Sequence, residues 1–166
     1  EEVSMLENTL VSNPDLKVIL APHYIDNKTI SDLSALLPIP SKRYTEISHD
    51  DLASEKVLIL DTMGMLSGIY HYGDFAFIGG GFKDGIHSIL EPASFGLPLF
   101  FGPHHKSFPE AQVLIDTGGA WEVNDKAAFE RTFEVIYNNN ELAQKSGMAV
   151  SKFIDSQKGA SECIVK

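Results

Sequence analysis

Short apolar runs alternate along the chain with segments whose apolar residues recur at helical spacing. The apolar runs predict buried strands at 17–21, 57–60, 75–78 and 98–101, and shorter strands at 42–47 and 120–123. The helical spacing predicts helices over 1–13, 26–37, 88–96, 106–117, 126–137 and 140–157. Strands that alternate with helices imply crossover connections, and hence a parallel sheet covered on both faces. The pattern therefore predicts one doubly wound α/β domain over residues 1–166.

Ligands of doubly wound sheets bind beyond the carboxyl ends of the strands. The loop 79–88 lies at that edge, where a buried strand runs into Gly79-Gly80-Gly81 and then into a predicted helix start. Glycine lets the backbone approach a ligand closely, and a helix N-terminus attracts phosphate. His87 could donate to a phosphate oxygen, and Glu91 could accept hydrogen bonds from a ribose diol.

A structural reading of the same residues stays open. Ser88 and Glu91 have the spacing of a capping box, in which Glu91 bonds only the backbone of its own helix. Three glycines can also form a tight turn and nothing more.

Three other loops lie at the same predicted edge. In 61–65, Asp61 or Thr62 could cap a helix, and the amides of Met63 and Gly64 could contact a base or a phosphate. In 22–26, His23 could reach a ligand. The loop 102–107 carries two adjacent histidines, but neighbours in sequence seldom point at one ion, so we expect no metal site.

Composition narrows the choice of partners. Thirteen basic and 23 acidic residues give a net charge of -10, which argues against nucleic acid or an anionic membrane as the main partner. The single cysteine, Cys163, excludes an internal disulfide and a CxxC metal site. No apolar run approaches the ~20 residues of a membrane span, so we expect this chain to be soluble. Glu1-Glu2 leads directly into a helical pattern, and we expect a fragment of a longer protein.

The sequence resembles the C-terminal half of the 3-deoxy-D-manno-octulosonic acid (Kdo) transferases. The segments that carry the resemblance are Gly79-Gly80-Gly81-Phe82, Gly85-Ile86-His87-Ser88-Ile89-Leu90-Glu91-Pro92-Ala93, Phe95-Gly96-Leu97-Pro98, Phe101-Gly102-Pro103, Asp61-Thr62-Met63-Gly64-Met65-Leu66, Pro22-His23, Phe108-Pro109-Glu110-Ala111 and Gly118-Gly119-Ala120. The chain departs from the family pattern at Pro22-His23, where many members have Pro-Arg-His, and at Ile86, Ser88 and Met65.

The resemblance implies a Rossmann-like domain, the C-terminal half of a GT-B glycosyltransferase, which binds the donor CMP-Kdo. On the resemblance, the donor-binding residues are Met63 and Gly64 at the nucleotide, Gly79, Gly80, Gly81 and His87 at the phosphate and sugar, Glu91 at the ribose, and His23 near the donor. Ser88 is also expected to bind the donor. The family implies neither a metal nor a cofactor.

For the full-length enzyme, the resemblance implies inverting transfer of Kdo from CMP-Kdo to a lipid A precursor, at the cytoplasmic face of the bacterial inner membrane. The catalytic carboxylate is expected in a separate N-terminal domain, which a membrane anchor precedes, so we expect this chain alone to be inactive.

Two other interpretations fit the glycine-rich segment. The chain could be the donor-binding half of another GT-B nucleotide-sugar enzyme, a different glycosyltransferase or an epimerase. It could also be a non-enzymatic α/β module in which the loop only turns and Glu91 only caps.

Overall fold

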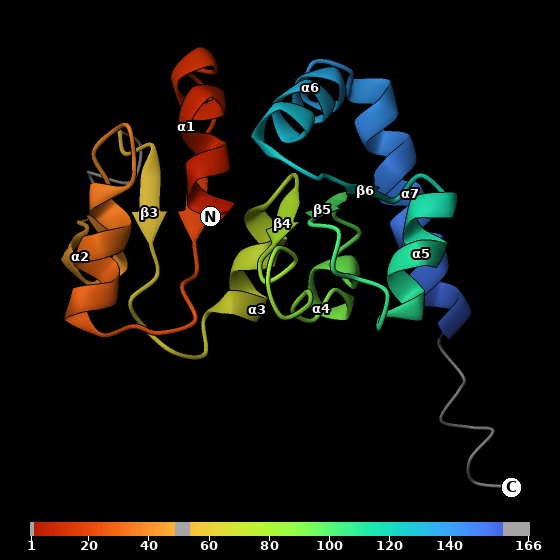
Figure 1. Cartoon of the computed structure of the whole chain (residues 1–166), viewed down its shortest axis with the longest axis horizontal. Helices are drawn as coiled ribbons and strands as arrows, with labels where there is room; N and C mark the ends of the chain where they lie inside the picture. The colour runs from red at the N-terminus through yellow and green to blue at the C-terminus, as the bar shows by residue number, and fades with distance from the viewer. Residues whose placement is uncertain (1, 49–53, 158–166) are drawn as a thin grey trace, which may run out of the picture. The chain divides into compact units, whose positions relative to one another are not determined.

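The computed structural model describes residues 2–48 and 54–157 and divides the chain into two compact units, 1–68 and 69–166. Each unit contains a parallel three-stranded sheet with helices (Figure 1). The predicted α/β class with parallel pairing is confirmed. The strands of the described residues hydrogen-bond as two sheets of three, and a single domain over 1–166 stays a prediction.

The first unit has the strand order β1-β3-β2. Its elements are α1 (Glu2–Ser12), β1 (Val18–Leu20), α2 (Asn27–Ala35), β2 (Lys42–Arg43), a 3₁₀ turn η1 (Tyr44–Glu46), β3 (Val57–Ile59) and α3 (Leu66–Ile69), which crosses into the second unit. Figure 1 shows α1 and α2 on either side of β3. Leu20 and Arg43 both pair with Ile59, so the carboxyl ends of the three strands meet at one edge.

The burial predicted for residues 17–21 is wrong. Strand β1 forms at the expected place, but Ile19 at its centre is 43% exposed. The reason is position in the sheet, because β3 lies between β1 and β2 and its Val57 and Ile59 are fully buried. An edge strand can have the same apolar composition as a central one, so its sequence does not reveal its exposure.

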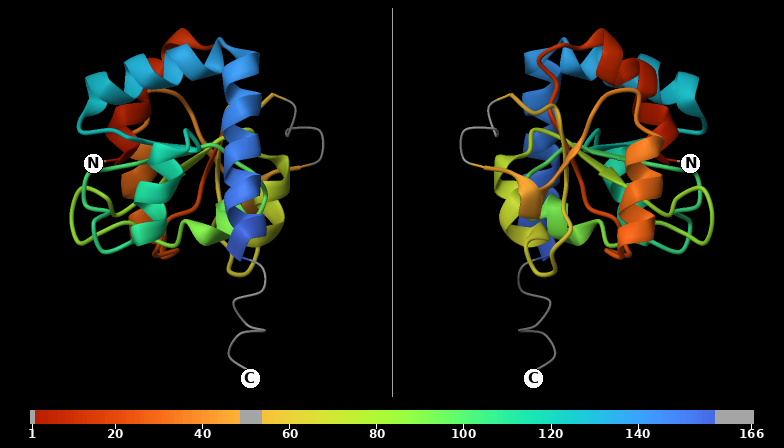
Figure 2. Two further views of the ribbon diagram at one scale, coloured as in Figure 1. Left: turned by 90° about the vertical axis from the view of Figure 1, so that its right-hand side faces the viewer. Right: turned by 90° about the vertical axis from the view of Figure 1, so that its left-hand side faces the viewer.

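The second unit has the strand order β4-β5-β6. Its elements are a 3₁₀ turn η2 (Tyr70–Tyr72), β4 (Ala76–Ile78), α4 (Leu90–Ala93), β5 (Leu99–Phe101), α5 (Pro109–Asp116), β6 (Ala120–Glu122), α6 (Lys126–Tyr137) and α7 (Asn140–Gln157). Helix α7 contacts α4, α5 and α6, and Figure 2 shows it as one long unbroken helix.

Side chains alternate across the second sheet, and both of its faces are covered. Phe77, Phe100 and Trp121 are register partners on one face, where the Trp121 ring stacks on Phe100 at a centroid distance of 5.3 Å. The rings of Phe77 and Phe100 contact Phe129 and Phe133 of α6 at centroid distances from 5.3 to 6.0 Å. The residues of the other face join the helices in one core, made of Ala76, Ile78, Leu99, Phe101 and Ala120 with Ile89, Ala93, Ala111, Leu114, Val150 and Phe153. Coverage on both faces explains why these strands read as continuous apolar runs.

The helix expected over 88–96 is much shorter in the structure. Helix α4 has a single turn, Leu90–Ala93, followed by turns through Gly96, whose φ is +71°. The helix has its C-cap at Ser94, and the positive φ at Gly96, which L side chains avoid, then turns the chain away from helical geometry. Only a small dipole develops over one turn, so the phosphate argument from a helix N-terminus is weakened.

Candidate functional site

The glycine loop, residues 79–87, leaves the carboxyl end of β4 and folds back on itself. The carbonyl oxygen of Gly80 accepts hydrogen bonds from the amides of Lys83 at 3.0 Å and Gly85 at 3.2 Å. Gly80 has a φ of +87°, and a Cβ there would lie 2.4 Å from the Gly85 oxygen. The turn therefore requires glycine at position 80, whether or not a ligand binds.

Gly81 is required by a second structural contact. A Cβ on Gly81 would lie 2.6 Å from the backbone nitrogen of Gly102, and a Cβ on Gly102 would lie 2.6 Å from the carbonyl carbon of Gly81. The loops after β4 and β5 thus pack backbone against backbone. The amide of His104 donates to the Gly81 oxygen at 2.9 Å, and the amide of Ile86 donates to the His104 oxygen at 3.2 Å.

Gly79 differs from the other two glycines. A Cβ at position 79 would make only an ordinary contact with the His87 ring, 3.5 Å from Cδ2, and its φ is not positive. The His87 amide donates to the Gly79 oxygen at 3.0 Å, which brings the exposed His87 ring beside this glycine. The fold gives no reason for glycine at position 79, and a ligand that approaches the backbone would supply one.

The capping box expected from Ser88 and Glu91 does not form. Helix α4 takes Ile89 as its N-cap, without a side-chain hydrogen bond. Both Ser88 and Glu91 are exposed, so the Glu91 carboxylate is available to solvent or to a ligand. The pKa of Tyr70 is raised, mainly because its phenol is partly buried. The second cause is the negative charge of the nearby Glu91 carboxylate.

The adjacent histidines after β5 have different partners. The exposed His104 has its Nδ1 2.6 Å from the Lys83 oxygen, which ties it to the glycine loop. His105 is buried, and its Nε2 lies 2.6 Å from Oε2 of Glu122 at the end of β6. Within residues 2–48 and 54–157, no group of three or more His, Cys, Asp or Glu side chains is arranged to hold a metal ion.

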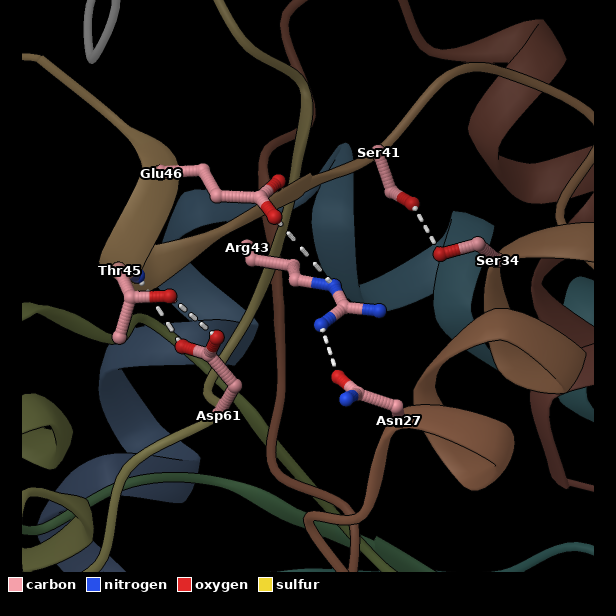
Figure 3. Close-up of polar contacts among 7 residues, drawn as sticks. All are labelled: Asn27, Ser34, Ser41, Arg43, Thr45, Glu46 and Asp61. Atoms are coloured by element: carbon pink, nitrogen blue, oxygen red, sulfur yellow. Dashed lines mark hydrogen bonds and ion pairs between the residues drawn. The ribbon is translucent and has the colours of Figure 1, made fainter.

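Asp61 and Thr62 do not cap a helix. The Asp61 carboxylate follows β3 and accepts hydrogen bonds from the Thr45 amide at 3.1 Å and from the Thr45 hydroxyl at 2.5 Å (Figure 3). The Thr62 hydroxyl lies 3.0 Å from the Met65 sulfur, and α3 begins only at Leu66. The chain bends through 62–64, where Met63 is 79% exposed and Gly64 has a φ of +81°.

Sequence reasoning missed the partners that surround Asp61. Arg43 ends β2, and its Nη1 donates to Oδ1 of Asn27 at 2.7 Å, while its Nε lies 3.8 Å from Oε1 of Glu46 (Figure 3). The Glu46 carboxylate therefore accompanies the guanidinium, and the Asp61 carboxylate is near enough for the charge of Arg43 to lower its pKa. Because the sequence predicts this strand over 42–47, Arg43 lay near its beginning, and its position at the carboxyl end of β2 could not be foreseen.

The hydrogen bonds at this edge change the acidity of Asp61. Desolvation pushes its pKa upward, but the hydroxyl and amide of Thr45, together with the charge of Arg43, outweigh that effect. The pKa of Asp61 therefore lies below the ordinary value of 3.8.

His23, the third candidate of the first unit, is exposed, and its ring meets Tyr24 edge-on at 4.7 Å.

Sequence comparison finds similar proteins of one kind. No protein-family model matches the chain. Over 156 residues, which are 91% of this chain and 36% of the relative, the sequence is 32% identical to the 3-deoxy-D-manno-octulosonic acid transferase of Haemophilus influenzae. The Chlamydophila psittaci transferase is likewise 32% identical, over 76% of this chain and 30% of its own length. The chain is thus similar in sequence to Kdo transferases over most of its length, and it spans about a third of the length of these relatives.

Solved structures share the fold. The C-terminal CMP-Kdo binding domain of WaaA from Acinetobacter baumannii superimposes with a TM-score of 0.79 at 22% identity, over 92% of this chain and 80% of that one. The C-terminal domain of a glycosyl transferase group 1 family protein, LpcC from Francisella tularensis, gives a TM-score of 0.65 at 11% identity, over 94% and 76%. The chain therefore has the predicted GT-B C-terminal fold. Among its described residues, no helix is both long and apolar enough to span a membrane.

Proposed function

We propose that this chain is the donor-binding part of a Kdo transferase and that its ligand is CMP-Kdo. The observation that carries the proposal is the 32% identity to a named Kdo transferase over 91% of the chain. The glycine loop supports it, since Gly79 has no structural requirement for glycine and stands beside His87 at the carboxyl edge of the sheet.

The proposed contacts are assigned within each unit. In the second unit, the glycine loop and Ser88 face the phosphate and the sugar, and the exposed Glu91 carboxylate accepts hydrogen bonds from the ribose hydroxyls. In the first unit, Met63 and Gly64 contact the nucleotide and His23 lies near the donor. The exposure of Met63, 79%, suits an apolar contact with a base.

The proposed reaction of the whole protein is inverting transfer of Kdo from CMP-Kdo to a lipid A precursor. A departing CMP phosphate requires stabilisation, which amides and His87 of the glycine loop would supply. The acceptor hydroxyl requires a general base, which we assign to an N-terminal domain that also binds the acceptor at the inner membrane. We expect the reaction to need neither a metal nor a cofactor.

Calorimetric titration tests the binding. We expect CMP to bind, and UDP to bind more weakly or not at all, because the nucleotide distinguishes a Kdo transferase from other GT-B enzymes. The isolated chain should transfer no Kdo. Preference for UDP, or Kdo transfer by the chain alone, would contradict the proposal.

Two variants separate binding from folding. Gly79→Ala adds a methyl group that meets nothing closer than 3.5 Å, so it should leave stability unchanged and weaken CMP binding. Gly68→Ala, which meets nothing within 4 Å, is the matched control and should bind normally. Glu91→Ala should likewise lose affinity at unchanged stability, because Glu91 forms no cap. A stability loss without a binding defect would favour a purely structural α/β module.

A further inference from the structure

A buried histidine joins the loop after β5 to the end of β6. His105 is 4% exposed, and its Nε2 lies 2.6 Å from Oε2 of Glu122, the last residue of that strand. A carboxylate oxygen only accepts hydrogen bonds, so Nε2 carries a proton and donates. Nδ1 is also buried and has no partner among the described residues. The hydrogen bond to Glu122 therefore holds the ring in place. Because its acceptor is a carboxylate, this bond is charge-assisted and stronger than one between neutral groups.

His104, the residue before His105, and Gly102 both contact the glycine loop, and we call these contacts the brace. The His104 amide donates to Gly81, its carbonyl accepts from Ile86, and its ring lies 2.6 Å from the Lys83 oxygen. Gly102 lies against Gly81 in the same brace. A displacement of His105 reaches these contacts through one peptide bond.

We infer that His105 and Glu122 form a positioning pair, which fixes the brace and through it the binding shape of the glycine loop. Neither side chain is among the proposed donor contacts. Its effect on the donor rests on the proposed function, whereas its effect on loop geometry does not. The contacts that fix the loop run from the end of β6 through His105 and His104 to the loop that carries Gly79 and His87.

Amide hydrogen exchange on the whole chain tests the inference directly. The reporter amides are those of Lys83, Gly85 and Ile86, which donate within the loop or to the brace, and the reference amides are those of β5. The variants are His105→Ala, which removes the ring, and His105→Gln, whose Nε2 can donate to the same carboxylate. Ser107→Ala, at an exposed position of the same loop, is the matched control.

We expect His105→Ala to speed exchange at the reporter amides by about 10-fold or more with β5 unchanged, since loss of the brace opens the loop locally. His105→Gln should restore most of the protection, and the control should match the parent. CMP affinity should fall in His105→Ala and largely recover in His105→Gln. Equal acceleration at the loop and at β5, or no acceleration, would overturn the inference.

The two proposals fail separately. Absence of CMP binding to the parent chain would refute donor binding, and the exchange pattern would still decide the role of the pair. If His105→Ala does not fold, Glu122→Ala removes the same bond from a side chain that is 36% exposed and gives the same prediction for the reporter amides.

Discussion

Replacing Gly81 by alanine should destabilise the second unit far more than its small size suggests. The added Cβ would lie 2.6 Å from the nitrogen and 2.8 Å from the Cα of Gly102, and 3.0 Å from Cγ2 of Ile86. Two of these atoms belong to the backbone, which cannot rotate away. Overpacking of this kind typically costs about 1–3 kcal/mol. Loss of the His104 hydrogen bond to Gly81 adds about 1 kcal/mol.

Urea unfolding followed by tryptophan fluorescence measures this loss in the second unit, because Trp121 is the only tryptophan and lies in β6. With a slope of about 2 kcal/mol/M, a loss of about 3 kcal/mol lowers the midpoint by roughly 1.5 M. Gly79→Ala, which creates no short contact in the same loop, is the control and should keep the parent midpoint. Equal midpoints for the two variants would refute the packing argument.

Three further predictions concern other parts of the fold. Because the folded pKa of Asp61 is lowered, its stabilising effect is present above about pH 3.8 and is lost as the pH falls below that value. The variant Asp61→Asn should therefore lose less stability than the parent in acid, measured by urea unfolding at a series of pH values. Phe100→Ala, at a ring 1% exposed in the aromatic face, should cost about 3–5 kcal/mol in the fluorescence titration. Asp125→Ala removes the 2.7 Å cap bond to the Ala128 amide and should cost about 0.5–2 kcal/mol, measured by circular dichroism during unfolding.

Local pattern was sufficient for most elements of the fold. All six strands form inside their predicted ranges, and α6 and α7 match at both ends. These segments succeed because burial on two faces, or on one helix stripe, leaves a periodic trace in the sequence. The exposure of β1 and the shortness of α4 left no such trace, since strand order and the turn at Gly96 depend on tertiary neighbours.

The candidate site was less predictable for the same reason. The sequence marked the glycine loop but could not separate Gly79 from Gly81, because the contact that requires Gly81 comes from the loop after another strand. The sequence proposed Asp61 as a possible helix cap. In the structure, the amide and the hydroxyl of Thr45, just after the neighbouring strand β2, donate hydrogen bonds to the two carboxylate oxygens. Pairing across a sheet edge joins residues that no local spacing connects.

The contact between Gly81 and Gly102 also limits how this sequence can evolve. At Gly96, an added Cβ would meet the Ser151 hydroxyl at 2.6 Å, so a smaller partner could relieve that clash, although the positive φ would remain. Gly81 and Gly102 offer no such compensation, because each clashes with the other's backbone and a backbone atom cannot be mutated. A second substitution therefore cannot rescue a first at these positions, and both glycines should be invariant in any descendant that keeps the two loops in contact.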